Sequence, residues 1–342
     1  MNERALTFLE NSFLSPLLKD KDVTDVSYNG VSFFYVHNDK GRMKSNIKVP
    51  SEDVLNFIRQ IANFSESQFS YMSPNLDISV GKYRLNAVHP SIVRVENEKA
   101  CSFSMRIGSK ETRIKSGSEF ISKEAEAFLL KCLENEESIV IAGPTGSGKT
   151  ELQKYLLSKL KKNSRVIVID NILELENLRQ FEDLDLTSWQ VSPNNPNVSM
   201  QELIRTALRS NPDWLVVAEA RGKEMADVLT SVMTGHPIIT TLHAKSLEAI
   251  PKRVCRLIMQ SDQTQKYEDI LEDVYEHIKY YIYLNRKFIN SKKVVRYIDS
   301  IGELQKDGSM KVIYKRGKHE KDWYFNDFYW DFPGISLLFL YK

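Results

Sequence analysis

The chain has 342 residues, which is enough for one or two domains that each bury a core. Hydrophobic residues make up 42% of it and aromatic residues 10%, and this excludes an intrinsically disordered chain. Its 47 basic and 45 acidic residues leave a net charge of +2. That balance does not favour a polyanionic partner, so we expect no direct nucleic acid binding.

The cysteines and the apolar runs bear on where the protein works. The three cysteines are far apart and form no C-x-x-C pair, so we expect neither disulfides nor a zinc knuckle, and a reducing compartment. The first residues lack the basic segment and apolar run of a signal peptide. The apolar run at 335–340 is too short to span a bilayer. We therefore expect a cytoplasmic protein.

Residues 1–107 alternate short helical and β-rich patterns and predict an α+β domain. One or two helices are expected within 8–18, and a longer amphipathic helix begins at Ser51. Strands are expected at 23–27, 32–37, 77–80, 83–89 and 100–107. Three arginines of this part, Arg84, Arg94 and Arg106, are each flanked by apolar residues, and each is either a surface residue of a sheet or a contact to a nucleotide bound by the next domain.

A polar, charged segment rich in small residues spans 108–119. We interpret it as a hinge linker between the first domain and a second domain over 120–342. The second domain opens with a helix that Ser122 caps and that carries acidic residues in its first turn.

The segment 138–150, S-I-V-I-A-G-P-T-G-S-G-K-T, joins a buried-strand pattern to a glycine-rich turn and a helix start. It fits G-x-x-x-x-G-K-[ST], the phosphate-binding P-loop. Glycines let backbone N–H groups close around phosphate oxygens, and the following helix points its positive end at the same place. In this motif the lysine reaches the β and γ phosphates and the adjacent hydroxyl binds Mg²⁺. The expected nucleotide-binding residues are Gly143, Pro144, Thr145, Gly146, Ser147, Gly148, Lys149 and Thr150.

Two further buried-strand patterns end at acidic residues. The run at 165–169 ends at Asp170, with Glu174 close behind, and the run at 214–218 ends at Glu219. Ligands bind at the carboxyl ends of parallel strands in open α/β sheets, and a strand that ends in an acid downstream of a P-loop is the Walker B arrangement.

Another predicted strand, at 238–242, ends at His243. Beside a P-loop, we interpret this histidine as a sensor of the γ-phosphate or as a residue that stabilises the domain interface. Arg221 follows the Walker B acid, and Arg209 ends the preceding helix. Both are candidates to neutralise phosphate charge.

The last part of the chain predicts a helix at 269–277 and strands at 280–284, 294–300 and 310–314, which form an antiparallel appendage. The tail at 323–332 is unusually aromatic. These side chains either pack on the P-loop domain or offer an apolar patch to a partner in a membrane complex.

The order of these motifs resembles the secretion ATPases shared by type II and type IV secretion, type IV pili and conjugation. Besides the P-loop, the matching stretches are the acids at 170–174, L-R at 208–209, P-D at 212–213, A-E-A-R-G at 218–222, T-G-H at 234–236 and T-T-L-H-A at 240–244. The N-terminal part adds V-T-D-V at 23–26, N-G at 29–30, Pro74, Asp77 and S-x-R at 104–106. The resemblance implies an α/β protein, in which a P-loop NTPase (RecA-like) domain follows a smaller α+β domain.

The chain also departs from the family's pattern. The Asp box usually reads Glu-Asp-x-x-Glu, and Asn171 removes one of its carboxylates. The Walker B glutamate usually follows a glycine, and here it follows Ala218. The zinc-binding cysteines of many type II enzymes are absent. We therefore place the chain in the type IV secretion branch, with conjugation as its setting.

The resemblance implies Mg²⁺-dependent ATP hydrolysis by in-line attack of water on the γ-phosphate. Lys149 would hold the phosphates, Thr150 and Glu219 would hold Mg²⁺, and Glu174 or Glu219 would activate the water. These two acids are left as alternatives.

The resemblance further implies a homo-hexameric ring that binds the nucleotide between its two domains, where Arg84 or Arg106 clamps it on closure. Hydrolysis would swing one domain against the other. Inner-membrane secretion or conjugation components would be the partners and would hold the protein at the inner face of the membrane.

Two other functions stay open. Ring-shaped P-loop motors also move nucleic acids, although the near-neutral charge disfavours a nucleic-acid translocase. The chain is alternatively a nucleotide-binding assembly scaffold with little turnover, a reading motivated by Asn171.

Overall fold

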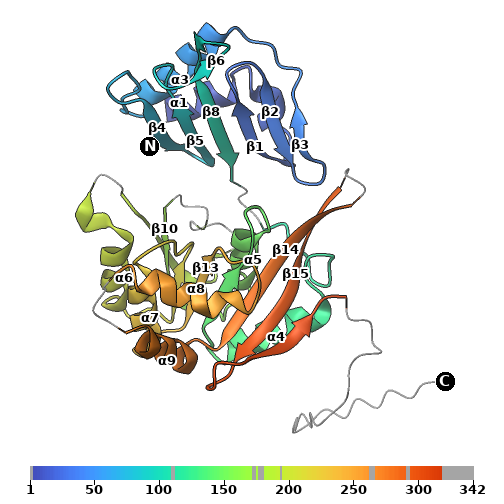
Figure 1. Cartoon of the computed structure of the whole chain (residues 1–342), viewed down its shortest axis with the longest axis vertical. Coiled ribbons are helices and arrows are strands. Elements are labelled where there is room, and N and C mark those ends of the chain that lie inside the picture. Colours follow the sequence, from blue (N-terminus) through green and yellow to red (C-terminus); the bar gives the residue numbers. More distant parts are fainter. Residues whose placement is uncertain are drawn as a thin grey trace, which may run out of the picture.

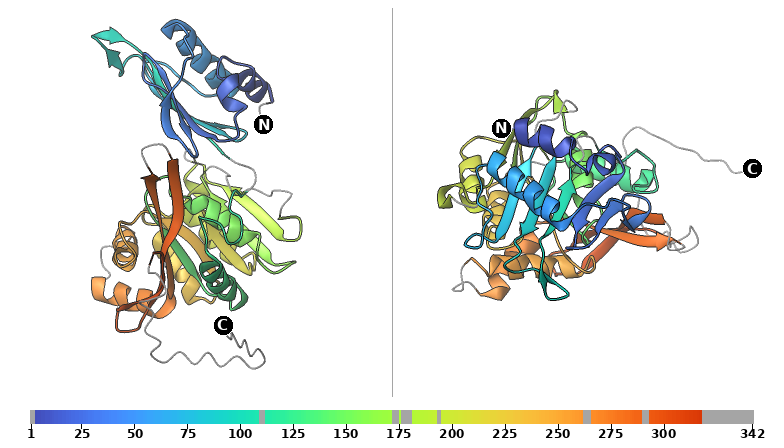
Figure 2. Two further views of the ribbon diagram at one scale, coloured as in Figure 1. Left: turned by 90° about the vertical axis from the view of Figure 1, so that its right-hand side faces the viewer. Right: turned by 90° about the horizontal axis from the view of Figure 1, so that it is seen from above.

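A computed structural model describes residues 3–108, 112–171, 175, 181–192, 195–261, 266–289 and 293–317. These residues form two large β-sheets and a short two-stranded ribbon. The sheet of the N-terminal residues lies above the larger C-terminal sheet in Figure 1, and the side view in Figure 2 shows the same stacking.

The N-terminal sheet has six antiparallel strands in the order β3-β2-β1-β8-β5-β4. Its elements are α1 (Glu3–Glu10), α2 (Ser15–Leu18), β1 (Val23–Tyr28), β2 (Phe33–His37), β3 (Gly41–Lys44), α3 (Ser51–Phe64), β4 (Asn75–Val80), β5 (Tyr83–Val88), the ribbon strands β6 (Arg94–Val95) and β7 (Glu98–Lys99), and β8 (Ser102–Ile107).

Among the described residues, helices cover one face of this sheet. Exposed and buried residues alternate along β4, as expected for a strand with one face on a core. The buried side chains pack with those of α1, α2 and α3 in one apolar cluster. The opposite face carries Arg84 on β5 and Arg106 on β8, which are direct neighbours across the two strands.

The C-terminal sheet has eight strands in the order β11-β10-β12-β13-β9-β14-β15-β16. Its elements are α4 (Lys123–Glu134), β9 (Ile139–Ala142), α5 (Lys149–Leu157), β10 (Arg165–Asp170), β11 (Asp185–Gln190), the 3-10 helix η2 (Pro196–Val198), α6 (Met200–Leu208), β12 (Trp214–Val217), α7 (Met225–Met233), β13 (Ile238–Leu242), α8 (Ala249–Ile258), α9 (Tyr267–His277), β14 (Tyr280–Ile289), β15 (Lys293–Leu304) and β16 (Met310–Lys315).

Both faces of the C-terminal sheet are covered by helices. Ile139 and Ile141 of β9 join the cluster formed with α4 and α5, whereas Val140 and Ala142 join the cluster formed with α6 to α9. All four residues of β9 are therefore buried, which is the burial pattern of a parallel strand inside an α/β sheet. The predicted α/β class, with a smaller α+β part in front, is confirmed.

The last three strands have the antiparallel pairing predicted for the appendage of the P-loop domain. They pair antiparallel with one another, but β14 also pairs in parallel with β9, so they extend the P-loop sheet itself. The strands are also longer than predicted, and the hairpin of β14 and β15 rises toward the N-terminal sheet (Figure 1). The aromatic tail at 323–332 lies outside the described residues.

The first described part of the linker is bound to the P-loop helix. Thr112 Oγ1 donates to the backbone carbonyl of Glu151, and the backbone N–H of Arg113 donates to the Glu151 carboxylate. The guanidinium of Arg113 in turn donates to the backbone carbonyl of Lys21 in the N-terminal part.

A second attachment lies at the other end of the linker. The carboxylate of Glu126 in α4 accepts hydrogen bonds from Ser116, Gly117 and Tyr155 of α5. Burial alone would raise the pKa of Glu126, but these hydrogen bonds lower it below its ordinary value. The hinge and the domain bounds 1–107, 108–119 and 120–342 stay predictions, and residues 112–117 are anchored to α4 and α5.

Candidate functional site: a P-loop bordered by Glu219 and His243

The site forms where four parallel strands end at one edge of the C-terminal sheet. β9 leads into Gly143, β10 ends at Asp170, β12 leads into Glu219, and β13 leads into His243. Because their carboxyl ends meet at this edge, residues distant in the sequence become neighbours there, which is the usual ligand position in open α/β sheets.

Two glycines make the sharp course of the P-loop possible. A Cβ on Gly143 would lie 2.5 Å from the backbone carbonyl oxygen of Leu284, so β14 approaches too closely for any side chain. Gly148, the N-cap of α5, has a φ of +97°, and a Cβ there would lie 2.7 Å from Cε2 of Phe120. Both positions require glycine for reasons of packing as well as ligand approach.

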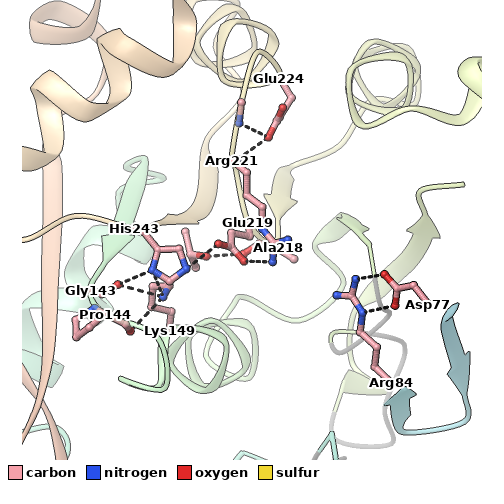
Figure 3. Close-up of polar contacts among 12 residues, drawn as sticks. Asp77, Arg84, Gly143, Pro144, Lys149, Ala218, Glu219, Arg221, Glu224 and His243 are labelled. Carbon is pink, nitrogen blue, oxygen red and sulfur yellow. Dashed lines mark hydrogen bonds and ion pairs between the residues drawn. The ribbon is translucent and has the colours of Figure 1, made fainter. Parts of the chain in front are cut away.

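Lys149 is the first residue of α5, and its ammonium group lies within the loop. Its Nζ donates to the carbonyl oxygens of Gly143 at 3.2 Å and Pro144 at 3.4 Å, and lies 3.4 Å from Nδ1 of His243 (Figure 3). Only 9% of the residue is exposed. Burial lowers the pKa of Lys149 to about 8, although the charge of Glu219 opposes this shift.

Glu219 is held between two basic groups. Its Oε2 lies 2.7 Å from Nη2 of Arg221, and its Oε1 lies 3.1 Å from Nε2 of His243. Burial alone would raise the pKa of Glu219, but the hydrogen bond from Arg221 and the nearby positive charges lower it below its ordinary value. Glu219 is therefore an ionised carboxylate at neutral pH.

The backbone around Glu219 is fixed by its neighbours. Thr241 Oγ1 donates to the carbonyl of Ala218 at 2.7 Å, and the N–H of Ala220 donates to the carbonyl of Thr241. Gln153 of α5, fully buried, donates from Nε2 to the carbonyl of Val217 at 3.2 Å. The first two bonds join the end of β12 to β13, and the third joins it to the P-loop helix.

His243 connects the P-loop with Glu219. Its Nδ1 lies 3.1 Å from the carbonyl oxygen of Gly143, while Nε2 faces Glu219. Burial and the charge of Lys149 lower the pKa of His243, so the ring is neutral at pH 7. A neutral ring carries one N–H, so it donates either from Nε2 to the Glu219 carboxylate, with Nδ1 accepting from Lys149, or from Nδ1 to the Gly143 carbonyl.

The two N-terminal arginines lie near this site. The charge of Arg106 contributes to lowering the pKa of Lys149. The charge of Arg84 acts to lower the pKa of Arg221, although the hydrogen bond to Glu219 raises that pKa overall. Arg84 also forms a two-point ion pair with Asp77, at 2.8 and 3.1 Å, and Figure 3 shows this pair on the strands that face the site.

The structure brings together most of the predicted site residues. The P-loop, Glu219, Arg221 and His243 form one cluster with Arg84 and Arg106 near it, whereas Glu174 lies outside the described residues. Arg209 is placed elsewhere. It is the C-cap of α6, which leads into the first residue of β12, so it lies at the opposite edge of the sheet from the P-loop.

The residues predicted to hold Mg²⁺ have suitable chemistry. Thr150 follows Lys149 in α5, and its hydroxyl makes no hydrogen bond within the described part of the chain. Glu219 is an ionised carboxylate, and hard cations such as Mg²⁺ prefer oxygen ligands of both kinds.

Sequence analysis missed several residues that support the site. Gln153 and Glu151 lie in the helix after the P-loop. Gln153 bonds to the backbone of Val217 and Glu151 to the backbone of Arg113, and both partners are distant in the sequence. Arg296 of β15, whose Nε donates to the carbonyl of Gly146 at 2.8 Å, is a charged residue inside an apolar run, V-V-R-Y-I. That interruption is the one signal in the sequence that marks it.

Comparison with known proteins agrees with this geometry. Residues 95–296 match the family described as Type II/IV secretion system protein. A protein of Bacillus anthracis described as uncharacterized is 29% identical over 318 residues, which cover 88% of this chain and 70% of that protein.

Two named relatives add to the match. The type IV secretion system protein VirB11 of Brucella suis is 32% identical over 161 residues, which cover 46% of this chain and 43% of that protein. The structure of the ATPase DotB from Legionella pneumophila has the same fold, with a TM-score of 0.62, 20% identity, and coverage of 86% of this chain and 79% of that one.

Within the described residues, no helix combines the length and the apolarity needed to cross a membrane. The matched region spans β6 to β15 and contains the P-loop, Glu219 and His243. The chain therefore belongs to the type II/IV secretion system protein family.

Proposed function

We propose that this protein is a Mg²⁺-dependent ATPase whose turnover drives a secretion, pilus or conjugation machine. The observation that carries the proposal is the unbroken set of contacts from the P-loop to the Walker B acid. Lys149 contacts His243, His243 contacts Glu219, and Glu219 contacts Arg221. A phosphate-binding loop, an ionised acid and two donors thus share one strand-end site.

The terminal phosphate would replace the carbonyl oxygens that now accept hydrogen bonds from the ammonium group of Lys149. Its present acceptors are two neutral carbonyl oxygens, whereas a phosphate oxygen is an anionic acceptor, and charge-assisted hydrogen bonds are roughly twice as strong as neutral ones. The backbone of Gly143 to Gly148 and the start of α5 would hold the remaining oxygens.

Thr150 and Glu219 would hold Mg²⁺, which neutralises charge on the β and γ phosphates when it is bound. Glu219 or Glu174 would orient the attacking water. Neutral His243 would report the state of the γ-phosphate to Glu219, since its two ring nitrogens face the P-loop and the carboxylate.

The finer assignment also belongs to this proposal. Similarity to VirB11 favours the type IV secretion branch, with conjugation as the setting. We propose a homo-hexameric ring in which Arg84 and Arg106 approach the phosphates from the N-terminal sheet. It would work at the cytoplasmic face of the membrane, through partners in the inner-membrane complex.

A second candidate is a nucleotide-binding scaffold with little turnover. Both oxygens of Glu219 are engaged, by Arg221 and His243, which leaves this carboxylate less available to Mg²⁺ or water. The departure at Asn171 favours the same reading.

Phosphate release from Mg-ATP by the full chain separates these candidates. For the ATPase, Lys149→Ala abolishes release, while Lys159→Ala, which removes an exposed lysine two residues beyond the end of α5, leaves it unchanged. Release that is equal in the wild type and Lys149→Ala supports the scaffold. Native mass measurement with and without Mg-ATP tests the hexamer, and salt-sensitive stimulation of release by DNA would indicate a translocase.

A further inference from the structure

Arg296 touches the P-loop with one part of its side chain and the N-terminal sheet with another. Its Nε donates to the carbonyl oxygen of Gly146 at 2.8 Å, and its Nη1 donates to the carbonyl oxygen of Asn38 at 2.8 Å. The three residues lie in the hairpin of β14 and β15, in the P-loop, and in the turn between β2 and β3. One guanidinium thus joins the nucleotide-binding loop to the other sheet.

The turn between β2 and β3 is built to present its carbonyls to β15. The N–H groups of Asp39 and Lys40 point inward to Nδ1 of His37, so neither competes for an external partner. The carbonyl of Asp39 then accepts the backbone N–H of Val294 at 2.6 Å, next to the bond between Asn38 and Arg296.

Packing holds this contact close. Gly41 has a φ of +77°, and a Cβ there would lie 2.9 Å from Cε1 of Phe288 and 3.4 Å from Cγ2 of Val294. Val294 is only 5% exposed although it lies near the tip of the hairpin. The turn and the hairpin therefore form a packed contact with two hydrogen bonds from β15.

The charge on Arg296 is not neutralised by an ion pair within the described residues; both of its acceptors are neutral carbonyls. Burial, followed by the charges of Arg286 and Arg113, lowers its pKa, and Asp39 and Asp25 partly oppose this. A half-buried guanidinium without a carboxylate partner depends on both carbonyls, because an unmet charged donor is costly.

We propose that Arg296 is a positioning residue that couples the conformation of the P-loop to the position of the N-terminal sheet. This inference rests on the proposed function. In a trans peptide the C=O and the next N–H point in opposite directions, so holding the Gly146 carbonyl sets the direction of the Ser147 N–H. That N–H donates to the carbonyl of Pro144 at 3.2 Å and is one of the groups that would bind phosphate.

The coupling runs in both directions. Movement of the turn at Asn38 displaces the Arg296 guanidinium and thereby changes the orientation of the peptide at Gly146. Phosphate binding at that peptide displaces the same guanidinium and thereby changes its hydrogen bond to Asn38. By linkage, nucleotide would bias the position of the N-terminal sheet as strongly as the sheet biases nucleotide binding.

Two substitutions separate this geometric bridge from a general charge effect. Arg296→Met removes both bonds, whereas Arg296→Lys keeps the charge but cannot donate from two separate nitrogens to two carbonyls. We expect kcat for Mg-ATP to fall about tenfold in both, because a displaced P-loop peptide misorients the bound phosphates, with KM changed much less. Lys287→Met, which removes an exposed charge from the same hairpin, leaves both constants unchanged.

A second variant breaks the contact from the N-terminal side. Gly41→Ala places a methyl group against Phe288, and Gly317→Ala is its control because Gly317 has a similar φ of +81° and open space around it. If the bridge is a single coupled unit, Gly41→Ala lowers kcat, and the combination with Arg296→Met lowers it no further. Full rescue by Arg296→Lys, or additive effects in the double variant, would overturn the proposal.

A distance measurement tests the bridge without turnover. Spin labels at Tyr71→Cys and Met233→Cys, both exposed, report the separation of the two sheets, since all three native cysteines are buried. Arg296→Met should broaden the distance distribution and remove its response to Mg-ADP, and an unchanged distribution contradicts the coupling. If the wild type binds no Mg-ADP, the proposed function fails, but the broadening without nucleotide still decides on the bridge.

Discussion

The two sheets use the same residue types in different ways. In the C-terminal sheet both faces are buried, and the polar side chains of the site come from the carboxyl ends of the strands. In the N-terminal sheet the described helices cover one face, and Arg84, the second residue of β5, and Arg106, the second-to-last residue of β8, project from the other face, as alternation dictates. In the C-terminal sheet the position of a functional side chain thus depends on where its strand ends. In the N-terminal sheet it depends on the pairing register of the strand.

This difference separates two kinds of sensitivity. A residue at a strand end depends on how far that strand runs, so Glu219 is fixed by bonds from Thr241 and Gln153 to the backbone just before it. A residue on an open face depends on pairing, since a shift of one position would turn Arg84 and Arg106 into the core. The strand-end residues should therefore dominate chemistry, and the face residues should modulate it.

The largest expected effect is at a strand end. Glu219→Gln keeps the shape of the side chain but removes the charge that faces Arg221 and His243. We expect turnover of Mg-ATP to fall by about 10²- to 10⁴-fold, the range for loss of an acid–base group, with nucleotide still bound. Phosphate release and calorimetric binding measure the two, and Glu202→Gln, whose side chain lies on the outer side of α6 and is 47% exposed, is the control. Near-normal turnover would assign the water to Glu174.

The next effect concerns stability. The pKa of Lys149 is lowered by burial to about 8, from an ordinary value of 10.5, so its charge destabilises the folded state at pH 7. The unfolded chain holds this proton more tightly, so the destabilisation is complete below pH 8 and disappears as the pH rises toward 10.5. We expect Lys149→Met to unfold at higher urea, with a gain of up to about 3 kcal/mol at pH 7. A loss of stability would show that the lysine is well compensated.

The same group predicts a pH dependence of nucleotide binding. Phosphate favours the charged ammonium of Lys149, so above pH 8 binding must take up a proton. Affinity for Mg-ADP should then fall by up to about tenfold per pH unit, and calorimetry in buffers of different ionisation enthalpy should detect the proton. Affinity that is constant from pH 7 to 9.5 contradicts this.

The smallest of these effects tests the open face. Removing Arg84 and Arg106 together takes two charges away from Lys149 and Arg221. We expect kcat/KM for Mg-ATP to fall about tenfold, with the fold intact by circular dichroism, since each is on the solvent side of its sheet. Arg94→Ala, on the ribbon strand β6, is the control. An effect as large as that of Glu219→Gln would remove the distinction between the two sheets.

The sequence predicted the features that local chemistry determines. The P-loop, the apolar strands that end at Glu219 and His243, and the helix that begins at Ser51 all carry short-range signals. It did not predict β11, whose mixed residues D-L-T-S-W-Q fit an edge strand but no regular pattern, or α8, which has a proline in its first turn.

Pairing between strands that are distant in the sequence was the main feature that could not be predicted. Nothing local in Tyr280–Ile289 shows that β14 aligns with β9, which lies about 140 residues earlier, so the predicted appendage became part of the main sheet. The role of Arg296 was missed for the same reason, because its partners Gly146 and Asn38 are distant from it in the sequence.

The anchoring of the linker has one more consequence. Glu151 fixes Thr112 and Arg113, and the carbonyl of Lys82 accepts the backbone N–H of Gly108 at 2.7 Å, so positions 108 and 112 are each bound to a neighbouring element. Four residue steps of about 3.5 Å separate positions 108 and 112, so these two positions can be at most about 14 Å apart. Any movement of the N-terminal sheet that keeps these bonds is limited to that distance at this point, so a larger movement must be a rotation about it.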